Sequence, residues 1–122
     1  MTTRREPAPP GLRIRIVLAR GLMLGPGKAD LLQGIHETGS IAAAGRQMKM
    51  SYKRAWMLVE TLNASFHEPL VPATRGGKSR GGATLTDLGK EILSAYRAIE
   101  AKATAATAPE FARLRALAVS PK

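Results

Sequence analysis

Four consecutive residues have side chains suited to contacting a nucleic acid: Ser51, Tyr52, Lys53 and Arg54. Lysine and arginine can donate hydrogen bonds to guanine O6 and N7, while serine and tyrosine can hold phosphate oxygens. A second basic cluster follows in a glycine-rich stretch that consists of Arg75, Gly76, Gly77, Lys78, Ser79 and Arg80. Its glycines permit close approach of the backbone to a surface, and its cations suit DNA phosphates or the minor groove.

The charge of the whole chain supports this interpretation. The 122 residues include 19 lysines and arginines against 9 acids, which gives a formal net charge of +10. Such an excess favours polyanionic partners, with nucleic acid first and an anionic membrane surface second. Between Arg46 and Arg80 the acids are only Glu60 and Glu68, so the positive charge is concentrated around the two clusters.

Other classes of protein are disfavoured by what the sequence lacks. It contains no cysteine, which is typical of a reducing compartment, and its apolar run from Ile14 to Leu24 is too short to span a membrane. His36 and His67 are isolated, so we expect no metal site, no cofactor and no catalysis. Gly77-Lys78-Ser79 matches the end of a nucleotide-binding P-loop, but Pro72 occupies the position of its first glycine. We therefore expect a cytoplasmic protein that is neither an enzyme nor membrane-bound.

The Ser51 cluster needs a helix that presents it outward. Ser40 and Ser51 are suitable N-caps for two successive helices. Ala42–Gly45 in the first helix is small enough for another helix to cross closely. In the second, an inward stripe recurs at helical spacing, namely Ala55, Val59, Leu62 and Phe66. This layout predicts a helix-turn-helix whose second helix enters the DNA major groove, with an ordinary helical hairpin as the alternative.

The elements around this pair follow from local patterns. Alternation over Leu12–Leu18 predicts a half-exposed strand, and Gly25-Pro26-Gly27 predicts the entry to a helix over 28–38. Leu70–Thr74 and Ala83–Thr86 would pair as a β-hairpin, or wing, with the second basic cluster at its tip. A merely solvated loop is the alternative there. Buried packing is expected of four residues, Met48, Met50, Trp56 and Met57.

A long helix should begin after Thr86, which is a suitable N-cap. It carries a narrow apolar seam formed by Leu88, Ile92, Ala95, Tyr96, Ile99 and Ala103. The seam could cap the core, but its length favours pairing with a second copy. A shorter helix over 110–119 would turn Phe111, Leu114 and Leu117 inward.

The expected fold class is therefore mainly α with a small β-hairpin, a winged helix-turn-helix followed by a long C-terminal dimerisation helix. Residues 1–11 would form a flexible arm, 12–85 the DNA-binding domain and 86–122 the helical dimerisation region.

Several of these residues also carry a family resemblance. The run Ser51-Tyr52-Lys53 followed by Ala55-Trp56, and the pair Gly76-Gly77-Lys78 and Gly81-Gly82-Ala83, resemble the N-terminal domain of ModE-type, molybdate-dependent transcriptional regulators. Those regulators are related to LysR-type DNA-binding domains, and the resemblance covers roughly residues 24–106. It implies a winged helix-turn-helix that dimerises through its terminal elements and binds double-stranded DNA at a palindromic operator.

The sequence departs from that family in one respect. Molybdate binds C-terminal domains in those regulators, and this sequence ends at Lys122 without them. We therefore expect neither molybdate binding nor a small-molecule effector on this chain, which is either a stand-alone member or an excised domain. Two alternatives remain: a protein that coats nucleic acid without sequence preference, and a DNA-binding subunit that docks a separate sensor protein.

Overall fold

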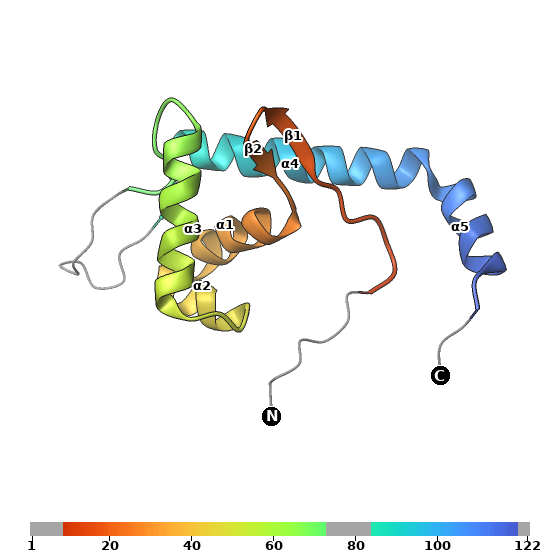
Figure 1. Ribbon diagram of the computed structural model, residues 1–122, viewed down its shortest axis with the longest axis horizontal. Helices are drawn as coiled ribbons and strands as arrows, with labels where there is room; N and C mark the ends of the chain where they lie inside the picture. Colours follow the sequence, from red (N-terminus) through yellow and green to blue (C-terminus); the bar gives the residue numbers. More distant parts are fainter. Residues whose placement is uncertain (1–8, 73–83, 120–122) are drawn as a thin grey trace.

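The computed structural model describes residues 9–72 and 84–119, which form a two-stranded antiparallel sheet and five helices. The strands are β1 (Ile16–Ala19) and β2 (Leu22–Leu24), and the helices are α1 (Pro26–Thr38), α2 (Ile41–Gln47), α3 (Tyr52–Ser65), α4 (Asp87–Ala106) and α5 (Ala108–Leu117). Helices α1, α2 and α3 lie beside one half of α4, and the other half extends away from them to α5 (Figure 1). The expected class, mainly α with a small β-hairpin, is confirmed.

The three helix starts expected from the sequence are capped as predicted. Ser40 Oγ accepts a hydrogen bond from the Ala43 amide at 3.0 Å, and Ser51 Oγ accepts one from the Arg54 amide at the same distance. Thr86 Oγ1 likewise accepts from the Gly89 amide at 3.0 Å. Each cap satisfies an amide that has no partner inside its own helix, so a short side-chain oxygen fixes where the helix begins.

Small residues bring α2 close to both of its neighbours. A Cβ added to Gly34 of α1 would lie 2.9 Å from Ala44 Cβ, and one added to Gly45 of α2 would lie 3.0 Å from Ala55 Cβ of α3. Both distances are too short for larger side chains. The expectation that the small-residue helix is crossed closely by its neighbours is therefore confirmed.

The core forms where these helices meet α4. Its largest fully buried side chains are Leu31, Leu32, Ile35, Val59, Leu62, Leu70, Val71 and Tyr96. Trp56, Met48 and Met50 are partly buried against this core, in agreement with their expected packing role. Met57 is 54% exposed, so its assignment to the core was wrong. It lies on the face of α3 opposite to the buried stripe.

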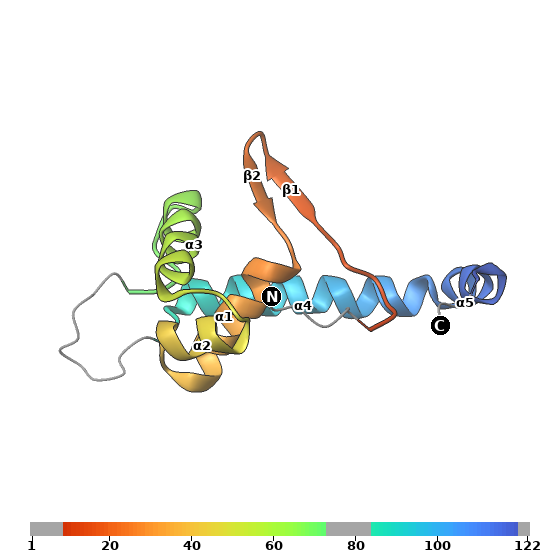
Figure 2. The same cartoon turned by 60° about the horizontal axis from the view of Figure 1, so that its bottom comes forward.

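The N-terminal strand differs from its prediction. The alternating pattern predicted one strand over Leu12–Leu18, but β1 begins only at Ile16 and is followed by the unpredicted β2. Ile16 lies opposite Leu24, and Val17 lies opposite Met23. Gly21, with φ of 78°, makes the reversal between the strands possible because the left-handed region suits glycine. This hairpin projects away from the helices (Figure 2).

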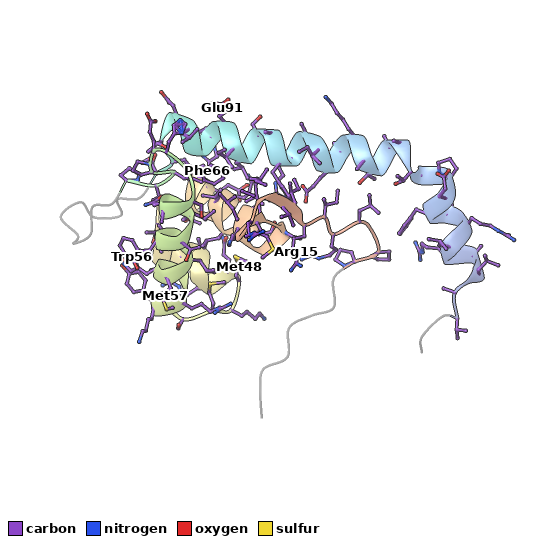
Figure 3. All side chains as sticks on the ribbon, turned by 45° about the horizontal axis from the view of Figure 1, so that its top comes forward. Arg15, Met48, Trp56, Met57, Phe66 and Glu91 are labelled. Atoms are coloured by element: carbon purple, nitrogen blue, oxygen red, sulfur yellow. The ribbon has the colours of Figure 1, made fainter. Side chains whose placement is uncertain are left out.

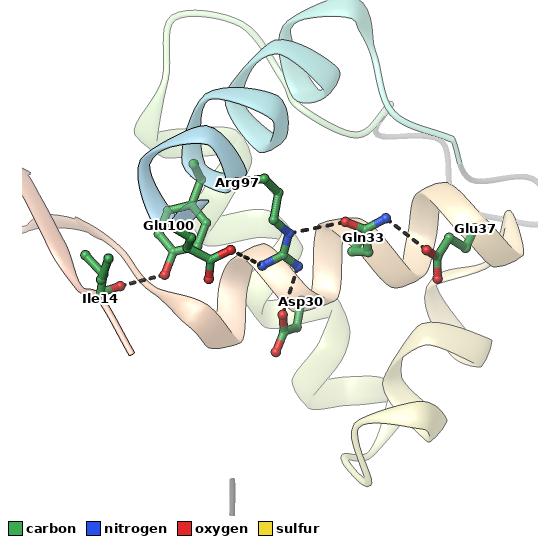
Figure 4. A network of polar contacts seen from close by, with 7 residues as sticks. Ile14, Asp30, Gln33, Glu37, Arg97 and Glu100 are labelled. Carbon is green, nitrogen blue, oxygen red and sulfur yellow. Dashed lines mark hydrogen bonds and ion pairs between the residues drawn. The ribbon is translucent and has the colours of Figure 1, made fainter. Parts of the chain in front are cut away.

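Helix α4 is attached to α1 and to the N-terminal segment by polar contacts (Figure 4). Arg97 donates to Asp30 and to Glu100, each at 2.9 Å, and to Gln33 at 3.3 Å. Burial opposes the charged form of Arg97, but these hydrogen bonds outweigh it and raise its pKa. Tyr96 donates its hydroxyl proton to the Ile14 carbonyl at 2.6 Å. Burial, followed by the nearby Glu100 carboxylate, raises the pKa of Tyr96, which keeps this donor protonated.

These contacts correct one residue of the expected dimerisation seam. Tyr96 is 1% exposed and belongs to the core of its own chain, so it offers almost no surface to a second copy. Leu88 and Ile92 also pack partly against this core. The apolar residues of α4 therefore form two stripes, and one of them packs against the core of its own chain.

The C-terminal end is exposed rather than packed. Helix α5 has no buried residue, and Leu114 and Leu117 are 66% and 62% exposed. The expectation that α5 turns inward was wrong for Leu114 and Leu117, whereas Phe111 is half-buried. Helix α5 follows the end of α4 that lies beyond the other helices and, among the described elements, packs mainly beside α4. Within residues 9–72 and 84–119, none of the helices has both the length and the apolar character needed to cross a membrane.

Candidate nucleic-acid interface

The leading end of α3 presents the expected basic cluster to solvent. Tyr52 is 53% exposed, and Lys53 and Arg54 are exposed beside it. Ser51 is also exposed, but its hydroxyl oxygen caps the helix, so its first role is to position the residues that follow. The inward side of α3 is held by Ala55, which lies against α2. The helix is therefore supported from behind while its first turn faces outward.

The outer face of α3 combines charge with aromatic and apolar surface. The ring of Tyr52 meets that of Trp56 edge to face, with centroids 6.5 Å apart and planes 74° from parallel. Met57 lies on the outer side of the helix, and Trp56 beside it keeps part of its ring exposed while the rest packs against the core (Figure 3). Tyr52 is thus braced by its neighbour one turn on, which reduces the rotamer freedom it would lose on contacting a partner.

The electrostatics of α3 favour an anion at its start. Its first turn contains no acidic residue, and Glu60 is the one acid between Tyr52 and Ser65. The aligned peptide dipoles place partial positive charge at the N-terminus of a helix, where it adds to the charges of Lys53 and Arg54. Helices α4 and α5, by contrast, carry Asp87 and Glu110 in their first turns.

The base of the segment 73–83 is fixed by a side chain of α3 and by Thr86, the N-cap residue of α4. Asn63 Oδ1 accepts from the amides of Leu70 at 2.8 Å and Val71 at 3.1 Å, and Asn63 Nδ2 donates to the Val71 carbonyl at 2.9 Å. On the other side, the Thr86 amide donates to the Leu70 carbonyl at 2.9 Å. The chain therefore leaves and returns at one place next to the second half of α3.

The predicted wing is tested only at this base. Residues 70–72 and 84–86 belong to no strand, so the strands predicted over Leu70–Thr74 and Ala83–Thr86 are absent from the parts that are described. Asn63 takes the amides that a strand partner would otherwise use. The second basic cluster, Arg75 to Arg80, lies outside the described residues.

The structure also gathers basic residues that the sequence analysis did not assign to a site. Arg13, Arg15, Lys28 and Lys49 lie around one hollow with Arg54. The sequence signal for them was only their charge, because they belong to separate segments. Within the described residues, no group of three or more histidines or acids could hold a metal ion.

Comparison with known proteins gives relatives for most of this chain. It is 46% identical over 87 residues to the molybdenum-pterin-binding protein MopB of Rhodobacter capsulatus, 41% over 80 to the molybdenum transport protein ModE of Azotobacter vinelandii, and 36% over 87 to the transcriptional regulator ModE of Haemophilus influenzae. These matches cover 70%, 66% and 71% of this chain. This chain is a homologue of the N-terminal part of ModE-type regulators.

The ModE-type relatives are longer proteins. The matched residues cover 32%, 30% and 34% of the same three proteins, so the chain spans about a third of their length. No family model matches it. The resemblance expected from the Ser51 and Gly76 motifs is nevertheless confirmed, and transcriptional regulators among the relatives agree with the expectation of a protein that is not an enzyme.

A solved structure supports the fold independently. The DNA-binding domain of CbnR, determined in complex with DNA, superimposes with a TM-score of 0.54 over 74% of this chain and 95% of that domain. The two are 22% identical, so the likeness concerns the fold. The CbnR domain is a LysR-type winged-helix domain, and this agrees with the fold expected from the sequence.

Proposed function

We propose that this protein is a ModE-like, sequence-specific DNA-binding transcriptional regulator that inserts the start of α3 into the DNA major groove. The observation that carries the proposal is the exposed, acid-free first turn of α3, backed by α2. Lys53 and Arg54 would read base edges, while Ser51 and Tyr52 would contact phosphates. Residues Arg75 to Arg80 would contact flanking phosphates or the minor groove. The mechanism is stoichiometric binding to duplex DNA, without chemistry and without a cofactor.

Selection of bound sequences from random duplex DNA tests this function. A regulator should enrich a defined motif and bind it roughly 1000-fold or more tightly than random duplex. A ratio near one would contradict the proposal and favour a protein that coats nucleic acid, because charge alone supplies non-specific affinity.

The division of roles between the two basic clusters gives a mutational prediction. Lys53→Ala should weaken binding to the selected motif by about 1–3 kcal/mol while changing random-duplex affinity much less, because it removes a base contact. Lys78→Ala should weaken both by a similar factor, since phosphate contacts carry little sequence information. Lys90→Ala on α4, which is exposed and removes the same charge, is the control. Equal effects of Lys53→Ala and Lys78→Ala on the two DNAs would contradict this division.

We further propose that the regulator binds a palindromic operator as a homodimer. The far half of α4 carries Ile99, which is 44% exposed, and α5 adds exposed Leu114 and Leu117. Together with Ala95 and Ala103, these residues offer an apolar surface to a second copy. Two copies related by a two-fold axis there would read half-sites about 34 Å apart, one turn of DNA.

The dimer can be tested on α4 alone. Ile99→Asp should shift the protein from dimer to monomer and raise the dimer dissociation constant on the order of 100-fold, because two isoleucines lose their burial and two charges are buried instead. Ala101→Asp adds the same charge to the opposite, exposed face of α4 and should leave the dimer intact. Sedimentation equilibrium measures both. Loss of the dimer in neither variant, or in both alike, would place the interface elsewhere.

A further inference from the structure

A basic groove adjoins the start of α3 and shares Ser51 and Arg54 with the cluster that we propose contacts DNA. Its hollow has a volume of about 910 Å³ and runs between the N-terminal segment, the first turn of α1 and the corner that joins α2 to α3. Arg15 and Met48, which are both labelled in Figure 3, belong to its lining. Five cations from these separate segments line it: Arg13, Arg15, Lys28, Lys49 and Arg54.

The positive charge of this groove is not neutralised from within. Asp30 is the one acid among the described lining residues, and its carboxylate is bound by Arg97 of α4 at 2.9 Å (Figure 4). In residues 9–72 and 84–119, the ion pairs are those that Arg97 makes with Asp30 and Glu100. None of the five groove cations therefore has an ion-pair partner in the described part of the chain.

Two helix starts add to this field. The first turn of α1 lines the groove at Pro26, Gly27 and Lys28, and the start of α3 lines it at Ser51 and Arg54. Neither first turn contains an acid, and α1 has no side-chain cap. Helix N-termini carry partial positive charge and free amides, so both favour an anion. The space around Gly27 is open, since an added Cβ would meet nothing within 4 Å.

The lining is not purely polar. Met23, Met48, Met50 and Leu58 contribute to it between the cations. An alternation of cations with apolar surface suits the sugar-phosphate backbone of a nucleic acid, in which charged phosphates alternate with deoxyribose rings. A small free anion would use the cations but not these side chains.

We propose that this groove binds the phosphate backbone of the DNA strand next to the base pairs contacted by α3. This inference rests on the proposed function, and it assigns DNA contacts to Arg13, Arg15, Lys28 and Lys49, which lie outside the cluster from Ser51 to Arg54. Arg54 belongs to both surfaces and joins them. The groove contributes affinity that does not depend on sequence and fixes the angle at which α3 meets the duplex.

The test compares two double variants of equal charge. Arg13→Gln/Arg15→Gln removes two exposed groove cations, and Arg113→Gln/Arg115→Gln removes two exposed cations from α5, none of whose residues lines the groove. Affinity for the selected motif and for random duplex is measured over a range of salt concentrations. The groove variant should flatten the plot of log affinity against log salt by about 0.9 for each phosphate that the protein no longer neutralises, on both DNAs alike, while the α5 variant keeps the wild-type slope.

Further measurements keep the outcome interpretable. Circular dichroism checks whether the double variant folds. Lys28→Gln, a single change on α1, is a second groove variant that replaces it if it does not, and it should flatten the slope by about 0.9. Shortening the duplex flanks should remove the difference between wild type and the groove variant. An unchanged slope in both groove variants would overturn the proposal and leave the proposed function standing. A motif-to-random ratio near one in the wild type would overturn the proposed function, whatever the slopes show.

A free-anion site is distinguished by competition. Inorganic phosphate, exchanged for chloride at constant ionic strength, should displace DNA equally from the wild type and from Arg13→Gln/Arg15→Gln. Selective displacement from the wild type would show a site for small phosphate ions and overturn the assignment to the DNA backbone.

Discussion

Replacing Gly89 by alanine should lower the free energy of unfolding by about 2 kcal/mol or more, although alanine normally stabilises a helix interior by about 1 kcal/mol. A Cβ at Gly89 would overlap with the Leu70 carbonyl oxygen and lie 3.1 Å from the Leu70 carbonyl carbon and 3.2 Å from Leu85 Cβ. The obstruction is mostly backbone, and that carbonyl is already held by Thr86. The clash can be relieved only by moving α4 away from the chain that precedes the segment 73–83.

Denaturant unfolding followed by circular dichroism measures this loss. Gly27→Ala is the matched control, because an added Cβ there meets nothing within 4 Å and the position lies in the first turn of α1. It should be neutral or slightly stabilising. Equal stability of the two variants would mean that α4 and Leu70 do not approach each other as closely as the structure has them.

The second large effect is expected at Asn63. Asn63→Ala should cost about 3 kcal/mol, because it leaves the amides of Leu70 and Val71 and the Val71 carbonyl without the partner they have in the folded state. These groups are part-buried, so water cannot fully replace the amide. The loss should appear in the same unfolding experiment.

A conservative variant separates the three bonds of Asn63. Asn63→Asp keeps an oxygen that accepts from Leu70 and Val71 but loses the donor to the Val71 carbonyl, so its cost should lie between wild type and Asn63→Ala. Identical losses in both variants would mean that losing the donor to Val71, together with the carboxylate oxygen that then faces the Val71 carbonyl, outweighs the two bonds that aspartate keeps. No loss in either would contradict the role assigned to Asn63.

Both predictions concern the same place in the fold. Asn63 from α3, Gly89 from α4 and Thr86, which caps α4, all contact Leu70, which is completely buried. Leu70 therefore couples the position of α4 to the second half of α3, and it fixes the point from which the second basic cluster departs. A change at either residue should weaken DNA binding through this geometry without removing any charge.

Local patterns in the sequence were sufficient for the starts of the three helices that have a side-chain cap. Ser40, Ser51 and Thr86 cap the helices that they were expected to cap, because a capping bond spans only three residues and depends on little else. The exposed cluster from Ser51 to Arg54 follows for the same reason, since the inward stripe of α3 determines its outward face. That this cluster contacts DNA stays a prediction, as does the pairing of the α4 seam with a second copy of the chain.

Predictions that depended on what packs nearby were less successful. The strand over Leu12–Leu18 and the inward face of α5 were drawn from periodicity, which gives an apolar face but not its partner. The spacing of apolar residues placed Tyr96 in the dimerisation seam of α4. Its hydroxyl instead donates to the carbonyl of Ile14, 82 residues earlier. No local signal distinguishes such a residue from its exposed neighbour Ile99.

The amino-acid sequence by itself determined the helix-turn-helix, its caps and its excess of positive charge, because these depend on side chains a few residues apart. Only the tertiary structure decided which cations share a surface: Arg13, Arg15, Lys28 and Lys49 meet Arg54 around one groove although they come from separate segments. Asp30, which also lines that groove, is paired with Arg97 from α4. Charge in a sequence is a sum, whereas the field that a ligand meets depends on where the folded chain places each charge and its partner.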